Sequence, residues 1–199
     1  AEGLGEPSHL TPQTDDVEVA KRWFDEFESA GCDGIIAKKP ELEYEHGKRA
    51  MIKIKHRRTV DVVAGGTREH KDGGKIGSLL LGLYNEDGDL HFIGHCSGFP
   101  DVDRVEIFQR FTELEADDSF DEAARMPGGQ SRWSGDKDLS WTPVKPGVVV
   151  EVSYDQLEGD RFRHATRFHR WRPDKDPEDC TTEQLDLPEG PEFRDVVTR

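Results

Sequence analysis

Three short apolar segments in the middle of the chain, separated by glycines, constrain its fold more than any other feature. They are rich in valine, leucine and isoleucine and have the length of β-strands. Glycine pairs at 65–66 and 73–74 and a turn at 85–88 break the chain between them, as expected where turns join strands. The three predicted strands are Val60–Ala64, Ser78–Tyr84 and Leu90–Cys96.

A helix and two more strands are expected to follow. Asp101 should cap the helix, and the strands should lie at Val148–Tyr154 and Phe162–Trp171. About five strands with one helix after the third is the arrangement of an OB-fold, a small Greek-key barrel that binds nucleic acids. The apolar residues expected to face inward from the helix are Val102, Val105, Phe108, Phe111 and Leu114.

The N-terminal part of the chain has a different pattern. A helix is expected over Asp15–Ala30, with Thr14 as its N-cap, followed by two short strands at Ile35–Lys38 and Met51–Lys55. The whole chain is therefore predicted to be mainly β with some α. The predicted parts are a domain at residues 1–58, an OB-fold domain at 59–187 and a flexible tail at 188–199.

The charge of the chain is unevenly distributed. Its formal net charge is −15, which by itself argues against a nucleic-acid partner because phosphate binding needs a basic surface. However, residues 46–75 hold nine Lys/Arg against three Asp/Glu, and residues 161–175 hold six against one. Two basic segments therefore stand in an acidic chain, and they are either phosphate-binding regions or merely solvated strand faces.

The run Ile52-Lys53-Ile54-Lys55 alternates apolar and basic residues. Strand geometry sends both isoleucines to one face and both lysines to the other, so two ammonium groups about 7 Å apart should project together from a buried scaffold. Like charges this close favour an anionic group opposite them, and a phosphate is the natural one. The alternative is an exposed edge strand whose lysines prevent aggregation.

Two further segments carry charged groups at turns. Asp33 precedes Gly34 at the start of a short strand and could hold Mg²⁺ through one carboxylate ligand, although an ordinary Asp-Gly turn explains the pair as well. Residues 170–175 are basic and contain Pro173. Arginine suits bidentate contact with phosphate, and Asp174 could orient its basic neighbours; a charged strand end is the alternative.

These segments, in this order, resemble the ATP-dependent DNA ligases, in particular the compact type of actinobacteria. The matching strings are DGIIAK, MIKIKH, VDVVAGG, GGKIGSLLLGLY, IGHCSGF and RHATRFHRWRPDKDPEDCTTEQL. The resemblance covers about residues 3–187. It implies the end of a nucleotidyltransferase (ATP-grasp-like) domain followed by an OB-fold β-barrel.

The resemblance also implies roles for the residues of the first domain. Lys53 and Lys55 match the motif V lysines that contact the α-phosphate of ATP, and Lys38 joins them as a nucleotide-binding residue. Asp33 matches the acidic motif IV residue that supports Mg²⁺ or Mn²⁺, although the family more often has glutamate there. Met51 stands where the family commonly has tryptophan.

Motif VI and the DNA-binding surface fall in the second domain. Motif VI orients the pyrophosphate leaving group while a lysine is adenylylated, and its catalytic residues match Arg172, Asp174 and Lys175. Nicked duplex DNA is the expected substrate. The predicted DNA-binding residues are Arg57, Arg58, Arg68, Lys75 and Arg170.

The family's lysine nucleophile lies in a KxDG motif, which this sequence lacks. Lys71-Asp72-Gly73 has the wrong spacing and follows motif V. We therefore expect a ligase portion that acts with the missing N-terminal part of its nucleotidyltransferase domain, as a monomer. The alternatives are a non-catalytic OB-fold module that binds nucleic acid, or a relative such as an mRNA-capping enzyme or RNA ligase.

The cysteines and the apolar segments indicate where such a protein would function. The cysteines are odd in number, far apart and without metal-binding spacing, which indicates free thiols in a reducing compartment. The longest apolar run, at 76–84, is far shorter than the roughly 20 residues of a membrane-spanning helix. We expect a bacterial cytoplasmic protein without membrane association.

The absent KxDG motif leads to the first prediction. Incubated with labelled ATP and Mg²⁺, this 199-residue polypeptide should form no covalent lysine adenylate, because it lacks the lysine that attacks the α-phosphate. Gel electrophoresis with detection of the label measures this. A labelled band would contradict it.

Overall fold

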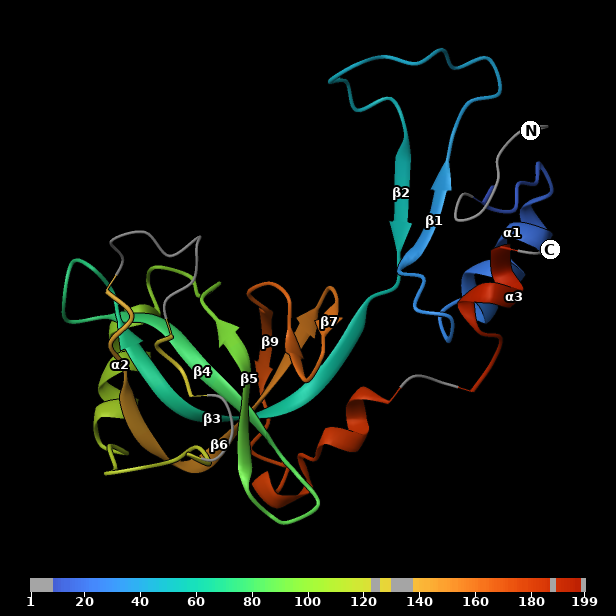
Figure 1. Ribbon diagram of the computed structural model, residues 1–199. Coiled ribbons are helices and arrows are strands. Elements are labelled where there is room, and N and C mark those ends of the chain that lie inside the picture. The colour runs from blue at the N-terminus through green and yellow to red at the C-terminus, as the bar shows by residue number, and fades with distance from the viewer. Residues whose placement is uncertain (1–8, 123–125, 130–137, 187–188, 198–199) are drawn as a thin grey trace. The chain divides into compact units, whose positions relative to one another are not determined.

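A computed structural model describes residues 9–122, 126–129, 138–186 and 189–197 (Figure 1). The chain forms two compact units, Ala1–His56 with Asp186–Arg199, and Arg57–Leu185, and each is described by itself. The smaller unit contains α1 (Val17–Glu26), β1 (Gly34–Ala37), β2 (Ile52–Lys55) and α3 (Phe193–Val197). The larger unit contains β3 (Arg58–Glu69), β4 (Ile76–Tyr84), β5 (Leu90–Cys96), α2 (Arg104–Thr112), β6 (Thr142–Tyr154), β7 (Leu157–Glu158), β8 (Arg161–Phe162), β9 (Arg167–Trp171) and the 3₁₀ helices η1 (Pro177–Asp179) and η2 (Thr182–Leu185).

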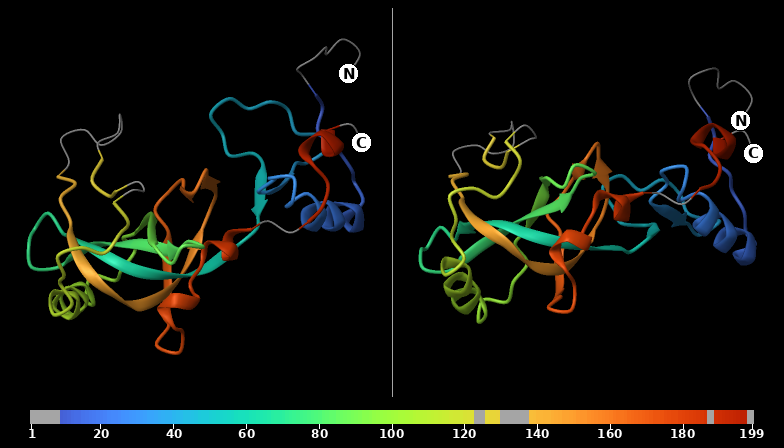
Figure 2. Two further views of the ribbon diagram at one scale, coloured as in Figure 1. Left: turned by 60° about the horizontal axis from the view of Figure 1, so that its bottom comes forward. Right: turned by 90° about the horizontal axis from the view of Figure 1, so that it is seen from below.

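The larger unit is built on one five-stranded antiparallel sheet in the order β5-β4-β3-β6-β9. Between Ala64 and Gly66, the register of β3 shifts by a β-bulge in its pairing with β4 and also in its pairing with β6. A bulge of this kind bends a strand and increases its twist. Figure 2 shows the long strands β3 and β6 curving across the unit, so the glycine pair predicted as a strand break is instead the bend within one strand.

The strand order and the helix after the third strand of this unit confirm the predicted fold class, mainly β with few helices. Closure of the barrel is less complete than expected. Within the described part of the chain, the end of β5 meets the segment before β9 through one isolated parallel bridge, between Cys96 and Thr166. Thr166 N–H donates to the carbonyl of His95 at 2.9 Å. The sheet therefore curls toward a barrel without a continuous ladder between its outer strands.

The core lies on the inner face of this curled sheet, under α2. Ile107 and Phe111 are the buried residues of α2. Val102 and Val105, which we expected to face inward, are 87% and 46% exposed. Val102 precedes the helix, which begins at Arg104, and Val105 lies on the face of the helix opposite the buried Ile107. The largest fully buried side chains are Phe111, Ile76, Leu79, Leu80, Leu81, Leu83, Ile93, Val62, Val63, Val144, Val150 and Val152.

The smaller unit differs from expectation at its helices. Asp16, rather than Thr14, caps α1 by accepting from the amides of Glu18 and Val19, and the helix ends at Glu26. Where the sequence indicated a flexible tail, the structure has α3, with Val196 3% exposed; residues 187–188 and 198–199 lie outside the described residues.

The cysteines are free thiols, as their spacing indicated. Cys96 and Cys180 are buried, and Cys32 is partly exposed. Burial raises the pKa of Cys180 to about 12 and also raises the pKa of Cys96 and Cys32. In the described part of the chain, no helix has the length and apolar character that crossing a membrane demands.

The bend in β3 can be tested at Gly66. A Cβ atom there would lie 2.7 Å from Cε3 of Trp141, so Gly66→Ala should reduce the free energy of unfolding by about 1–3 kcal/mol, the usual cost of overpacking. Gly98→Ala is the matched control, because its Cβ would meet nothing within 4 Å. Urea unfolding of both variants measures the difference, and equal stabilities would refute the close packing at the bend.

Candidate functional site

The hairpin of β1 and β2 holds the first group of candidate residues. Its antiparallel register pairs Gly34 with Lys55 and Ile36 with Lys53. Gly34 has a φ of +142°, and a Cβ at this position would collide with the carbonyl oxygen of Ile54. Glycine is therefore required where the chain leaves Asp33 and enters β1.

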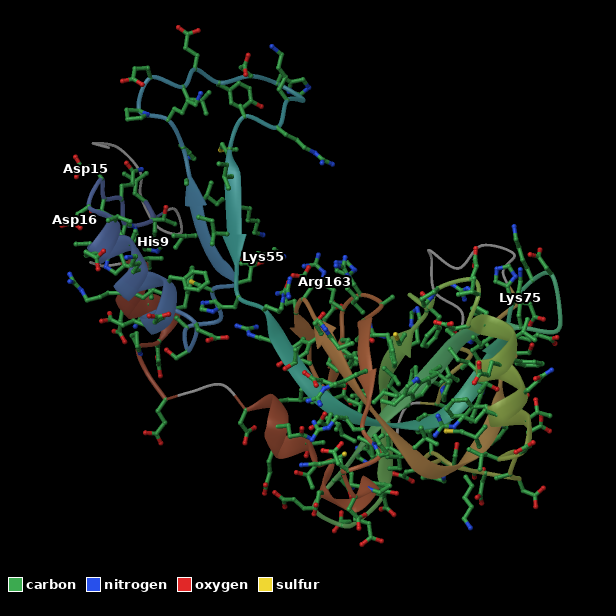
Figure 3. All side chains as sticks on the ribbon, turned by 180° about the vertical axis from the view of Figure 1, so that it is seen from behind. His9, Asp15, Asp16, Lys55, Lys75 and Arg163 are labelled. Atoms are coloured by element: carbon green, nitrogen blue, oxygen red, sulfur yellow. The ribbon has the colours of Figure 1, made fainter. Side chains whose placement is uncertain are left out.

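Lys53 and Lys55 lie on the same face of β2, as strand alternation predicted. Their Nζ atoms are 3.0 and 3.1 Å from one oxygen, Oδ2 of Asp33. The Lys53 hydrogen bond, followed by that of Lys55, lowers the pKa of Asp33 against the opposing effect of partial burial. The Asp33 side chain is 31% exposed and that of Lys55 33%, so water and other polar ligands can reach this cluster (Figure 3).

The other face of the hairpin carries the isoleucines of β2. Ile52 and Ile54 are 68% and 43% exposed, whereas we expected the lysines to project from a buried scaffold. Among the described residues, β1 and β2 pair with each other and with no third strand. The apolar face of this two-stranded sheet is therefore open to solvent in the chain.

His56 connects the hairpin to α1, a contact that the sequence gave no reason to expect. Its Nε2 is 2.7 Å from the carbonyl oxygen of Phe24, and its ring stacks on the Phe24 ring at 3.8 Å between centroids. His56 Nδ1 lies 3.6 Å from the carboxylate of Glu28. These contacts fix the chain directly after Lys55.

Asp33 is the candidate metal ligand of the hairpin. The described residues contain no cluster of three or more His, Cys, Asp or Glu side chains that could hold an ion, and two ammonium groups already contact Oδ2 of Asp33. Mg²⁺ needs six oxygen ligands, so any ion bound here would depend on ligands from outside the described residues. Lys38 follows β1 directly and is exposed.

Arg172, just after β9, is the centre of the second group. Its Nη1 donates to both oxygens of Asp61 at 2.7 Å, and its Nε and Nη2 donate to Asp174 at 3.0 and 2.9 Å. Hydrogen bonding to Arg172 lowers the pKa of Asp174 to about 2, and the two carboxylates raise the pKa of Arg172. Asp174 thus orients Arg172, as one reading of the sequence proposed. The Lys175 amide donates to the Arg172 carbonyl at 3.2 Å and closes the turn between them.

Two residues of this group, Asp61 and Gln184, were not predicted from the sequence. Asp61 lies on β3, 111 residues before Arg172, inside a run that sequence analysis treated only as a strand. The side-chain amide of Gln184 accepts from Asp61 N–H at 3.2 Å and donates to Asp61 C=O at 3.1 Å. A polar residue within a buried apolar strand was the available signal, because such a residue needs a partner.

The predicted DNA-binding residues do not form one patch. Arg57 directly precedes β3, Arg58 begins it and Arg68 lies near its other end, beyond the bend. Burial lowers the pKa of Arg68. Lys75 is ion-paired with Asp72 at 3.0 Å and Arg170 with Glu151 at 2.6 Å. Figure 3 shows Lys75 in the β3–β4 hairpin. Arg163, in the second basic segment (residues 161–175), lies far from it, beside β8.

Two models of known protein families match the sequence of this chain. The family model described as the ATP dependent DNA ligase C terminal region matches residues 72–175, more than half of the chain. The chain belongs to the ATP-dependent DNA ligases. A second model, the ATP dependent DNA ligase domain, matches residues 8–55 and includes both motif V lysines.

Curated relatives agree with this membership in the ATP-dependent DNA ligases. DNA ligase C2 of Mycolicibacterium smegmatis is 49% identical over 199 residues and DNA ligase C of Mycobacterium tuberculosis 48% over 202 residues. These alignments cover 92% and 95% of this chain and 56% of each relative. The chain thus spans little more than half the length of these DNA ligases.

A solved structure supports the same fold. The ligase domain of M. tuberculosis LigD matches with a TM-score of 0.53 at 30% sequence identity, over 73% of this chain and 46% of that domain. Both the sequence and the fold of the chain are therefore those of a DNA ligase.

The pairing of Asp33 with the motif V lysines can be measured directly. Lys53→Met should raise the pKa of Asp33 toward the usual aspartate value, because its largest stabilising hydrogen bond is lost. NMR titration of the Asp33 carboxyl carbon measures the shift, with Lys48→Met as the control because Lys48 pairs with Glu45 instead.

The sign of the linked stability effect follows from the lowered pKa. The contribution of Asp33 is fully present above the pKa of an unfolded aspartate and is lost as the pH falls through the lower folded value. In Lys53→Met this loss should begin at a higher pH. An unchanged Asp33 titration would show that the ion pair does not form in solution.

Proposed function

We propose that this chain is the C-terminal portion of an enzyme that seals nicks in duplex DNA with ATP. The observation that carries the proposal is the convergence of Lys53 and Lys55 on a single oxygen of Asp33. Two ammonium groups held this close favour a doubly charged ligand, and a nucleotide phosphate meets that requirement. The family membership of the chain supplies the reaction in which such a phosphate takes part.

The reaction has three stages, and the residues act on phosphates in each. A lysine outside this chain attacks the α-phosphate of ATP, pyrophosphate leaves, the AMP passes to the 5′-phosphate of the nick, and the 3′-hydroxyl displaces it. Lys53 and Lys55 contact the α-phosphate, with Lys38 beside them on the nucleotide. Arg172 and Lys175 act on the pyrophosphate leaving group, and Asp174 of the same motif orients Arg172 until the phosphate arrives. This work is positioning and charge stabilisation, which dominate phosphoryl transfer.

A divalent cation, Mg²⁺ or Mn²⁺, would offset phosphate charge, and Asp33 is the residue of this chain proposed to support it. Because the described residues contain no group of three or more His, Cys, Asp or Glu side chains that could hold an ion, the ion would rest mainly on phosphate oxygens and water. Lys53 and Lys55 would then exchange Asp33 for the phosphate and leave the carboxylate to the ion.

The partners of the chain follow from the same proposal. Nicked duplex DNA would contact Arg57, Arg58, Arg68, Lys75 and Arg170, and the remaining part of the nucleotidyltransferase domain would cover the open isoleucine face of β1 and β2. The exposure of Ile52 and Ile54 supports a covering element of this kind. Free thiols and bacterial relatives support a cytoplasmic enzyme in a bacterium, proposed to act as a monomer.

A non-catalytic OB-fold module that only binds nucleic acid is the second candidate. The curled sheet and the basic segment at residues 161–175 fit either candidate, since OB-folds commonly bind single strands through basic grooves. The two candidates differ in what Lys55 does, because a binding module has no use for a lysine that contacts ATP.

Substitution of Lys55 therefore tests the proposed function. With the chain fused behind the N-terminal part of M. smegmatis DNA ligase C2, Lys55→Ala should reduce nick sealing about 100-fold or more, the usual effect of removing one charge-stabilising group. Affinity for the nicked duplex should stay within about twofold. A gel assay measures sealing, and fluorescence anisotropy measures binding.

Lys48→Ala is the control, because Lys48 is an exposed lysine of the same unit that pairs with Glu45. It should leave both quantities unchanged. If Lys55→Ala instead weakens only DNA binding and reduces its salt dependence, the binding module is the correct function.

A further inference from the structure

Two carboxylates hold the Arg172 guanidinium along different edges. Both carboxylate oxygens of Asp61 accept hydrogen bonds from Nη1, whereas Asp174 accepts hydrogen bonds from Nε and Nη2, which form another edge of the guanidinium. The Nε and Nη2 edge is one of the two forks with which arginine binds a carboxylate or a phosphate bidentately. The two aspartates therefore do different things to Arg172.

The two contacts differ in their surroundings. The Asp61 side chain is 15% exposed, while that of Asp174 is 61% exposed. Solvent screens an exposed ion pair strongly and a largely buried pair much less. Asp61 also lies within the paired strand β3, opposite Glu151 of β6, whereas Asp174 lies in the turn after β9. Asp61 is thus the fixed contact and Asp174 the exchangeable one.

Gln184 fixes Asp61 further. The pairing of β3 with β4 begins at Val63, so the backbone of Asp61 has no strand on that side. The Gln184 amide supplies both hydrogen bonds that a neighbouring strand would make, at 3.2 and 3.1 Å. It comes from η2, in the segment that follows motif VI. The backbone behind the Asp61 carboxylate is therefore held on both edges of β3.

We propose that Asp61 is a positioning residue that fixes Arg172 for its action on the pyrophosphate of ATP. This inference rests on the proposed ligase function. By holding Nη1, Asp61 orients the guanidinium plane so that the Nε and Nη2 edge lies on the exposed side, where Asp174 now contacts it. A phosphate that displaces the exposed Asp174 carboxylate meets a guanidinium already in place. No bond of Arg172 or Asp61 is made or broken in the reaction.

The test uses the difference between stages of ligation. In the fusion with the N-terminal part of DNA ligase C2, Asp61→Asn keeps the shape of the side chain but removes its charge. Formation of the lysine adenylate from ATP should slow about 10- to 100-fold, as expected when a catalytic group is misplaced. Sealing of a nick that already carries 5′-AMP should stay within about twofold, since no pyrophosphate leaves in that stage. A folding defect would slow both.

A double-mutant cycle shows whether Asp61 acts through Arg172. In an Arg172→Lys background, Asp61→Asn should cause no further loss, because residues that work as one unit are not additive. Asp101→Asn is the matched control: Asp101 also pairs with a largely buried arginine, Arg104, at 2.9 Å. It should leave both rates unchanged.

The outcomes separate the inference from the function on which it rests. If the unsubstituted fusion seals nicks and Asp61→Asn forms the adenylate at the same rate, the positioning role is refuted and the ligase function stands. Equal slowing of both stages, or additive losses in the cycle, also overturns the positioning role. A fusion that seals no nick overturns the proposed function and the inference with it.

Discussion

The bend of β3 at Gly65 and Gly66 is the constraint on which the larger unit depends. A straight strand of 12 residues would give an open, flat sheet, and a flat sheet cannot enclose a core. The register shift at this point occurs toward both β4 and β6, so all three central strands turn together. Side chains of Phe120 and Trp141 lie where the two missing Cβ atoms would be. Asp61, which is hydrogen-bonded to Arg172, lies on the same strand before the bend.

Several of the candidate phosphate-binding cations are paired with carboxylates in the chain. Asp33 serves both motif V lysines, and Arg172, Arg170 and Lys75 each have at least one acidic partner. This explains how a chain with a net charge of −15 can belong to a family that acts on DNA. If phosphate binds at such groups as proposed, it replaces a carboxylate, so binding would gain from the higher charge of phosphate and from multiple contacts rather than from attraction over a distance.

Local patterns predicted part of this arrangement. Strand alternation was enough to place Lys53 and Lys55 on one face, and the two-residue separation of Arg172 and Asp174 was enough to suggest their contact. Asp61 and Gln184 lie 111 residues before and 12 residues after Arg172, and only the register of β3 with β6 and the path of the chain after β9 bring them together. The exposed isoleucines and the true start of α2 likewise depend on tertiary packing, which overrides periodicity in short segments.

The different burial of the three thiols has a practical consequence. Cys180 and Cys96 are fully buried. Because the pKa of Cys180 is about 12, only a very small fraction of this thiol is ionised near neutral pH. Cysteine-directed dyes react with accessible thiolates. Cys32 is the partly exposed thiol, and because its pKa is also raised, mildly alkaline pH should direct a dye to it without any cysteine being removed by mutagenesis. A fluorophore on Cys32 would sit next to Asp33 and its lysine pair, so its emission would report on changes in this cluster in real time.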